Sequence, residues 1–347
     1  MFEAVITLCL GLSGAPCRDH LLPGAEAATQ AECEAILTSD PRLQAIPEGP
    51  VAQGPARCQE VGATLDFTEV APGVYAHRGA IDVPNAQNKG DVTNLGFVVG
   101  AQSVAVIDTG TARWMGEATW RAIRARTDLP VSHVILTHMH PDHVLGASLF
   151  ADAGAEIVGH AALPRALSDR APNYLESLER LIGAEAFLGT RAVAIDRSVE
   201  GGFEIDLGNR VLEIKAWPAA HTGTDVTVFD LTTGTLFTGD LVFHEHTPAL
   251  DGRLLGWRAV LAEMAQMPVA RIVPGHGGPV LDWPESVAPM ARYLAVLEED
   301  TRAAIESGQR LGEAVEEIAR SEAPHWQLFD DYNPRNATVA FTELEWE

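Results

Sequence analysis

The sequence predicts an α+β fold in which two mixed sheets are sandwiched between helices, preceded by a small N-terminal unit that carries the cysteines. Three observations support this prediction. The chain has 347 residues, of which 46% are hydrophobic, enough for about two domains and too many for a mainly disordered protein. From about Thr64, short β-rich runs interleave with helical segments without a strict strand–helix–strand rhythm. The first part of the chain contains all of its cysteines, Cys9, Cys17, Cys33 and Cys58.

Residues 1–62 are predicted to form the separate N-terminal unit. The apolar run Val5–Leu8 predicts a strand. The alternative is a secretory signal, but the first basic residue is Arg18, so the positively charged start of such a signal is missing. A helix is expected near residues 27–37, and the four prolines within residues 41–56 predict a linker or an extended segment.

The clustered cysteines predict two disulfides, for which three pairings are possible. The alternative is four buried free thiols in a cytoplasmic protein. No CxxC spacing indicates a zinc site in this unit. Disulfides form in oxidising compartments, so this pattern favours a periplasmic location over a cytoplasmic one.

The charge of the chain excludes some classes of partner. The net charge is −24 and the isoelectric point is near 4.8. Such an acidic chain repels phosphate backbones and anionic lipid surfaces, which argues against a nucleic acid partner. No apolar run approaches the roughly 18 residues of a membrane span, so no span is predicted.

The main domain, residues 63–347, is predicted to contain alternating strands and helices. Strands are expected at 74–78, 93–99, 103–107, 131–136, 156–159, 203–206, 210–216, 226–231, 235–238 and 271–273. Helices are expected at 112–126, 144–151 and 254–267, with a helical hairpin over 161–189 and a mainly helical tail from residue 284.

The segment HMHPDH, which begins at His138, carries the strongest chemical signal. In an extended chain, residues two apart point the same way, so His138 and His140 direct two imidazoles to one point at the end of a strand. Pro141 fits the first turn of a helix, which would turn Asp142 and His143 back toward the same cavity. Imidazole and carboxylate groups are ligands of Zn²⁺ and its neighbours. The segment therefore predicts a metal site.

Three further candidates stand at the ends of other predicted strands. His221 begins HTGTD, Asp240 closes the strand TLFTGD, and His276 lies in PGHGG, where the flanking glycines allow close backbone approach. Singly, they have ordinary interpretations as a loop histidine, a helix-capping aspartate and a turn histidine. Their shared position at strand ends favours one common site.

Taken together, HxHxDH, a later histidine, an aspartate after a hydrophobic strand and GHG resemble the metallo-β-lactamase fold superfamily. The segment AVIDTG at residues 105–110 is similar to the family's early strand and turn. The resemblance covers about residues 64–300. It implies a four-layer αββα sandwich with a dinuclear metal site between the sheets.

Transferred by position, the resemblance implies two bound Zn²⁺ ions per chain. The first ion would be held by His138, His140 and His221, the second by Asp142, His143 and His276, and Asp240 would bridge the two. A hydroxide shared by the ions would attack a carbonyl, ester or sulfate centre, because metal binding lowers the pKa of water to about 7. Asp142 is the expected catalytic residue, which orients this nucleophile and relays its proton.

Details of the motifs distinguish branches of the superfamily. His140 in place of a glutamate disfavours the flavodiiron oxygen reductases. A bridging carboxylate at Asp240 is similar to that of glyoxalase II and related hydrolases, and it disfavours lactam hydrolysis.

A narrower resemblance links the two parts of the chain. The cysteine-bearing preface and the segment GDLVFHEHTPALDGRLLGW, which begins at residue 239, resemble the quinoprotein relay system zinc metallohydrolases. These SoxH-like proteins occur in bacteria that use pyrroloquinoline quinone-dependent periplasmic dehydrogenases. The resemblance implies a location outside the cytoplasm and a quinoprotein dehydrogenase as partner.

The predicted function is a dinuclear zinc metallohydrolase that acts on an ester, a thioester or a related small-molecule substrate, linked to quinoprotein metabolism. Two alternatives remain open: a β-lactamase-type hydrolase on the same site, and a non-catalytic metal-binding partner of a quinoprotein dehydrogenase. The sequence identifies neither the natural substrate nor an oligomeric state.

Residues outside the seven ligands also have expected roles. Asp108 is expected to support the ligand loops as a hydrogen-bond acceptor. His244 and His246 either face the substrate or form a solvent-facing loop pair. The segment from Arg335 onward is a candidate to cover the site.

Overall fold

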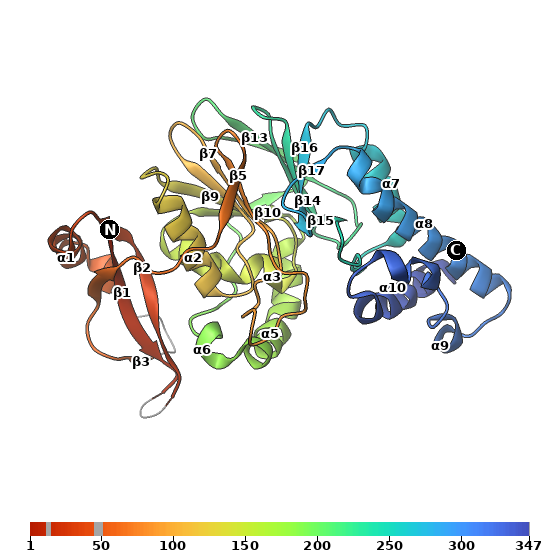
Figure 1. Cartoon of the computed structure of the whole chain (residues 1–347), viewed down its shortest axis with the longest axis horizontal. Coiled ribbons are helices and arrows are strands. Elements are labelled where there is room, and N and C mark those ends of the chain that lie inside the picture. The colour runs from red at the N-terminus through yellow and green to blue at the C-terminus, as the bar shows by residue number, and fades with distance from the viewer. Residues whose placement is uncertain (12–14, 45–50, 347) are drawn as a thin grey trace.

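A computed structural model describes residues 1–11, 15–44 and 51–346 of the chain. The predicted linker at 41–56 lies partly outside these residues, because 45–50 are not described. Within the described ranges, the chain forms a small four-stranded sheet followed by sheets of seven and six strands. Figure 1 shows the small sheet at one end of the molecule and the C-terminal helices at the other.

The N-terminal unit is an antiparallel sheet with one helix. Its central strand β1 (Phe2–Cys9) pairs with β2 (Cys17–Ala27), β3 (Val51–Ala52) and β4 (Arg57–Glu60). The helix α1 (Gln30–Ser39) starts at Thr29, whose side chain accepts a hydrogen bond from the backbone of Glu32, as a helix N-cap does. A 3₁₀ turn, η1 (Pro41–Gln44), follows.

The two predicted disulfides are present, and the structure gives their pairing. Cys9–Cys17 joins facing residues of β1 and β2. Cys33–Cys58 ties α1 to β4 across a sequence separation of 25 residues. Since a unit of this size buries little apolar surface, such cross-links supply much of its stability.

The seven-stranded sheet has the order β11-β10-β9-β8-β7-β6-β5. Its strands are β5 (Phe67–Ala71), β6 (Val74–His77), β7 (Leu95–Val99), β8 (Val104–Ile107), β9 (Val131–Leu136), β10 (Glu156–His160) and β11 (Arg197–Val199). Strands β5 to β8 are antiparallel, and β8 to β11 are parallel. Strand β8 is buried along its whole length, as expected for a strand covered on both faces.

The six-stranded sheet follows the chain order from β12 to β17. Its strands are β12 (Gly202–Asp206), β13 (Val211–Ala216), β14 (Val226–Asp230), β15 (Thr235–Phe243), β16 (Arg271–His276) and β17 (Leu281–Asp282). The two large sheets pack face to face through an apolar cluster that includes Ile107, Ile135, Phe237 and Val273. The contact is close, because a Cβ added to Gly96 would lie only 2.2 Å from the Phe237 ring.

Helices cover the outer face of each large sheet. The first sheet is covered by segments that include α2 (Arg113–Arg124), α4 (Ser148–Asp152), α5 (Leu163–Ile182) and α6 (Ala184–Phe187). The second sheet is covered by segments that include α7 (Leu254–Met264), α8 (Ala288–Glu306), α9 (Leu311–Ala314) and α10 (Phe329–Leu344). Three short 3₁₀ segments, η2 (Leu145–Ala147), η3 (Glu285–Val287) and η4 (Arg320–His325), complete the helical elements. The predicted αββα fold class is confirmed.

Some details differ from the predictions. The expected hairpin over 161–189 is one long helix, α5, which ends at Gly183 with φ of 91° and is followed only by the short α6. Asp240 does not close its strand, because β15 continues to Phe243. The pairing of β15 with β16 shifts on both sides of Gly239, whose φ is 50°. This irregularity is typical of a β-bulge, which re-aims a side chain without ending the strand.

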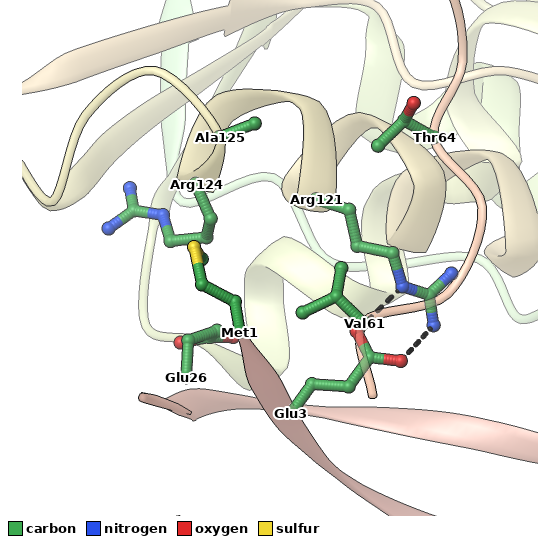
Figure 2. Close-up of a pocket in the computed structure, with 8 residues that line it drawn as sticks. All are labelled: Met1, Glu3, Glu26, Val61, Thr64, Arg121, Arg124 and Ala125. Atoms are coloured by element: carbon green, nitrogen blue, oxygen red, sulfur yellow. Dashed lines mark hydrogen bonds and ion pairs between the residues drawn. The ribbon is translucent and has the colours of Figure 1, made fainter. Parts of the chain in front are cut away.

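Buried charges attach the N-terminal unit to α2. Glu117 of α2 is buried and pairs with Arg18 of β2 at 2.6 Å and with Arg113 at 3.2 Å. Further along the same helix, Arg121 pairs with Glu3 of β1 at 2.7 Å. Figure 2 shows this second pair at the wall of a small cavity between β1 and α2. The interface therefore depends on paired charges as well as apolar contact.

No helix within the described ranges combines the length and the apolar character needed to cross a membrane.

Candidate metal centre

The segment HMHPDH follows β9 and lies between the two large sheets. The short helix α3 (Pro141–Val144) begins within this segment, with His140 in the N-cap position and Pro141 as the first helical residue. A proline is favoured there because its missing N–H group has no partner in the first turn of a helix. The predicted change from strand to helix within the motif is confirmed.

The other three predicted residues come from the second sheet. His221 lies in the turn between β13 and β14, where the buried Asp225 accepts hydrogen bonds from the backbone and hydroxyl of Thr222. Asp240 lies in β15, and His276 is the last residue of β16. A Cβ at Gly275 would lie 2.0 Å from Asp240 Oδ1, so a glycine is required for the two strands to approach there.

The structure brings all seven predicted residues together. Their nitrogen and oxygen atoms form two groups, each within 4.8 Å: the first is His138, His140, His221 and Asp240, and the second is Asp142, His143 and His276. The first group contains the three residues expected to hold the first ion, together with Asp240, and the second contains the three expected to hold the second ion.

Asp240 connects the two groups. Its Oδ2 lies 3.6 Å from His138 Nε2 and 3.4 Å from His221 Nε2 in the first group. The same oxygen lies 3.4 Å from His276 Nε2, and Oδ1 lies 3.2 Å from His143 Nε2 in the second group. One carboxylate therefore faces four imidazoles.

The imidazoles of the first group each direct one nitrogen inward and hydrogen-bond outward through the other. His138 Nδ1 donates to the Thr137 hydroxyl at 3.0 Å, and His221 Nδ1 donates to the carbonyl of Ala249 at 2.5 Å. His140 has the opposite orientation. Its Nδ1 lies 3.0 Å from His221 Nε2 inside the group, while its Nε2 points outward.

The imidazoles of the second group follow the same rule. His143 Nδ1 donates to Asp108 Oδ2 at 2.7 Å, and His276 Nδ1 donates to the carbonyl of Val92 at 2.9 Å. Asp108 also accepts from the backbone and hydroxyl of Thr137, so it supports both ligand loops as predicted. Outward hydrogen bonds of this kind fix the tautomer and orientation of a histidine that binds metal.

Burial controls protonation in the first group. It lowers the pKa of His138 well below the ordinary value of 6.5, with a further contribution from the nearby His143. Burial also lowers the pKa of His221 to about 3. Both rings are therefore neutral at pH 7, which is the form that binds a metal ion.

In the second group, nearby carboxylates determine the direction in which the histidine pKa values shift. Burial disfavours the protonated form of His143 and His276, but the nearby carboxylates, Asp240 foremost, together outweigh this, raising the pKa of His143 well above 6.5 and that of His276 to about 9. Burial would raise the pKa of Asp142 and Asp240, but the neighbouring imidazoles hold both below 3.8. The carboxylates of Asp142 and Asp240 thus carry negative charge that protons or a cation would neutralise.

The donor set fits bound cations. His138 Nε2 and Asp240 Oδ1 are buried and have no hydrogen-bond partner among the described residues. Buried polar atoms without partners are rare and costly in native proteins. Five imidazoles and two carboxylates that converge at these distances are the ligand types expected of Zn²⁺ or a neighbouring transition metal.

Several residues beside the site were not predicted, or only in part. His246 is buried against the ring of His276 at 4.9 Å and that of Tyr332 at 4.6 Å, so it is not part of a solvent-facing loop pair. The side chain of His244 is 34% exposed to solvent. Asp251 accepts a hydrogen bond from His140 Nε2 at 3.1 Å. Nothing local in the sequence distinguishes Asp251 from an ordinary loop aspartate.

Comparisons with known proteins agree with this geometry. A family model described as the metallo-beta-lactamase superfamily matches residues 88–276. A curated relative from Caenorhabditis elegans, the Beta-lactamase-like protein 2 homolog, is 26% identical over 162 residues, or 47% of each chain. The alignment therefore spans about half the length of that relative.

Solved structures share the fold at low sequence identity. TMB-1 is 18% identical with a TM-score of 0.53, covering 67% of this chain and 97% of its own. The metallo-beta-lactamase from Pontibacter korlensis is 20% identical with a TM-score of 0.55, covering 67% and 99%. The inverting sec-alkylsulfatase Pisa1 from Pseudomonas sp. is 17% identical with a TM-score of 0.59, covering 81% of this chain and 50% of its own.

Proposed function

Since this chain belongs to the metallo-β-lactamase superfamily, we propose that it is a dinuclear zinc hydrolase of small esters, thioesters or related substrates. The observation that carries the proposal is the position of Asp240, whose carboxylate faces the inward nitrogens of both groups at 3.2–3.6 Å. A carboxylate shared in this way is suited to bridge two cations.

Each group supplies enough ligands for one ion. His138, His140 and His221 offer three inward nitrogens for the first ion. For the second ion, His143 and His276 offer two nitrogens, and Asp142 Oδ2 lies 3.4 Å from His276 Nε2 and 3.6 Å from His143 Nε2. With Asp240 shared, each ion would have four protein ligands, and a water or a substrate would occupy a fifth coordination position.

The chemistry divides between the ions and the protein. When bound, a pair of zinc ions lowers the pKa of a water molecule and polarises the substrate oxygen. The side chain of Asp142 is 17% exposed to solvent, whereas that of Asp240 is 3% exposed. Asp142 is thus the carboxylate that reaches the open side of the centre. It orients the attacking water and holds its proton on a carboxylate oxygen.

The N-terminal unit supports a location outside the cytoplasm. The unit contains two disulfides, and disulfides persist in oxidising compartments. The resemblance to the quinoprotein relay metallohydrolases gives the periplasm as that compartment and a quinoprotein dehydrogenase as a partner. Mass spectrometry of the mature protein, isolated from periplasmic and cytoplasmic fractions without reductant, tests the compartment and the disulfides together.

Lactam hydrolysis is the second candidate, because solved β-lactamases share this fold. Asp240 argues against lactam hydrolysis, because a bridging carboxylate at this position resembles glyoxalase II and related hydrolases. Turnover of nitrocefin that exceeds turnover of every ester, thioester and sulfate ester would favour the lactamase. A non-catalytic metal-binding role would be favoured by full metal occupancy without turnover of any substrate.

Metal analysis of protein purified without chelators tests the proposal directly. We expect about two zinc equivalents per chain and fewer than one in Asp240→Asn, because both ions share that ligand. Hydrolysis of a panel of esters, thioesters and sulfate esters should fall by at least about 100-fold in the same variant. Asp330→Asn is the control, since Asp330 is an exposed carboxylate paired with Arg320. Fewer than about 1.5 equivalents in the wild type would refute the two-ion centre.

A further inference from the structure

His140 differs from the other four imidazoles of the site. It directs Nδ1 inward, whereas His138, His143, His221 and His276 direct Nε2 inward. This orientation leaves Nε2 of His140 at the outer side of the ring, where it lies 3.1 Å from Asp251 Oδ2.

The acceptor of this outward hydrogen bond is a carboxylate. A neutral imidazole carries one proton, and the nitrogen that holds it is set by the hydrogen bond that this nitrogen donates. An ionised carboxylate accepts hydrogen bonds and cannot donate one. Asp251 therefore favours the tautomer of His140 with the proton on Nε2, which leaves the lone pair of Nδ1 free for the centre.

Asp251 is itself held in place from three sides. Its backbone N–H donates to the carbonyl of His221 at 3.0 Å, which links it to a second residue of the same group. Arg170 of α5 donates to Oδ2 at 2.5 Å. Arg335 of α10 approaches Oδ1 at 3.6 Å. The side chain of Asp251 keeps only 15% of its exposure, so these contacts are partly shielded from solvent.

We propose that Asp251 is the positioning residue for His140 and that Arg170 and Arg335 hold its carboxylate in place. The proposal rests on the metal centre proposed above, because positioning has a function only where His140 binds an ion. The helix α5 covers the first sheet and α10 covers the second, so this carboxylate couples the first-ion group to both outer layers of the molecule. The segment at Arg335 thereby acts on the site through Asp251.

The tautomer of His140 in metal-free protein is the first measurement. Long-range ¹H–¹⁵N correlation spectra of histidine-labelled protein, assigned with His140→Gln, report which ring nitrogen carries the proton. We expect the Nε2–H form in the wild type and in Asp330→Asn, whose exposed carboxylate is again the matched control. In Asp251→Ala this preference should be lost.

Zinc affinity measured by chelator competition is the second measurement. Loss of a partner that orients a ligand weakens metal binding by about 10–100-fold, and we expect this for Asp251→Ala at one of the two ions. Asp251→Asn keeps a similar shape with a weaker, neutral acceptor, so it should retain the tautomer and weaken zinc binding less. Arg170→Gln should weaken binding while leaving the tautomer unchanged. Asp251→Asn remains informative if the alanine variant does not fold.

The possible outcomes separate this inference from the proposed function. If Asp251→Ala binds both ions with wild-type affinity and keeps the His140 tautomer, the inference is wrong and the hydrolase stands. If Asp251→Ala does not fold, wild-type zinc affinity in Asp251→Asn overturns the inference in the same way. If wild-type protein binds no zinc but the tautomer still depends on Asp251, the hydrogen bond is established and the proposed function fails. A change in tautomer together with at least tenfold weaker zinc binding supports both.

Discussion

Replacing Glu117 by alanine tests how the N-terminal unit is held to the rest of the molecule. The Glu117 side chain keeps 1% of its exposure and pairs with Arg18 from β2 and with Arg113 from its own helix. Both arginine side chains are largely buried, at 16% and 5% exposure. Removing the carboxylate leaves Arg18 without this buried partner, whereas Arg113 keeps Asp152 at 2.6 Å, and we expect a large loss of stability.

The size of this loss follows from the burial. Breaking a buried ion pair by removing one partner costs about 3–5 kcal/mol. A domain of this size loses about 2–4 °C of its melting temperature per kcal/mol, so the transition should fall by roughly 6–20 °C. Glu117→Gln keeps an acceptor oxygen without the charge, so its loss should be smaller, about 1–3 kcal/mol.

Scanning calorimetry and urea unfolding measure the effect, with Asp169→Ala as the control. Asp169 pairs with Arg165 on the surface, at 66% and 89% exposure, and such exposed pairs contribute about 0–1 kcal/mol. Equal shifts in Glu117→Ala and Asp169→Ala would refute the reasoning. So would release of an intact N-terminal unit without any change in the unfolding midpoint of the main domain.

The pH dependence gives a second check on Glu117. Burial would raise its pKa, but Arg18 and Arg113 lower the pKa below the ordinary value of 4.5. A carboxyl group with a lowered folded-state pKa contributes stability above its unfolded value, and this is lost as the pH falls through the folded value. Wild type and Glu117→Gln should therefore differ fully at pH 7, begin to converge as the pH falls below about 4.5, and meet only below the lower folded-state pKa.

Three further changes test the site and its supports. Gly275→Ala should displace the Asp240 carboxylate, since the added Cβ would lie 2.0 Å from Oδ1, and elemental analysis should find less bound zinc. Asn336→Ala removes two buried hydrogen bonds to the backbone at residues 248 and 250, and urea unfolding should show a loss of about 1–3 kcal/mol. Replacing Cys33 and Cys58 by serine opens a 25-residue loop, which should cost about 3 kcal/mol in thermal unfolding.

Each of these three changes has a matched control, and the comparison with it shows which result would contradict the prediction. Gly201 has nothing within 4 Å of an added Cβ, so Gly201→Ala should keep the zinc content, and equal losses would contradict the steric argument. Thr338→Ala lies on the exposed side of the same helix as Asn336 and should lose less stability than Asn336→Ala. Serine replacement of Cys33 and Cys58 should be without effect on a fully reduced sample, where the disulfide is already absent.

The sequence was most informative where one local pattern determines geometry. The strand Val131–Leu136 was predicted with its observed bounds, because its apolar residues, three of them consecutive at 134–136, stand out from the flanking segments. The two histidines that follow point the same way through simple alternation, and Pro141 identifies the start of α3. The grouping of His221 and His276 was predictable from their positions beyond or at the ends of strands of one sheet. Asp240 joins them although β15 continues past it to Phe243, because the irregularity at Gly239 re-aims its side chain.

The sequence was least informative where the structure of a segment depends on contacts with residues far away in the chain. Strand β2 contains Pro23 and Gly24, which locally indicate a turn. Its pairing with β1 nevertheless continues on both sides of them, because the ladder shifts register between Phe2 and Ala4. The role of Asp251 could not be predicted, because its hydrogen-bond partner His140 lies 111 residues earlier in the chain.

The division of the seven candidate ligands between the two sheets has a consequence for how the protein matures. A chain synthesised only as far as β11 contains His138, His140, Asp142 and His143 but lacks the three donors that lie at residues 221, 240 and 276. In the proposed two-ion centre, neither ion would acquire its full coordination until the second half has folded against the first. If the proposed centre is correct, loading of the cations would be a late event in biogenesis, and the time course of zinc uptake by a refolding chain would report when its halves join.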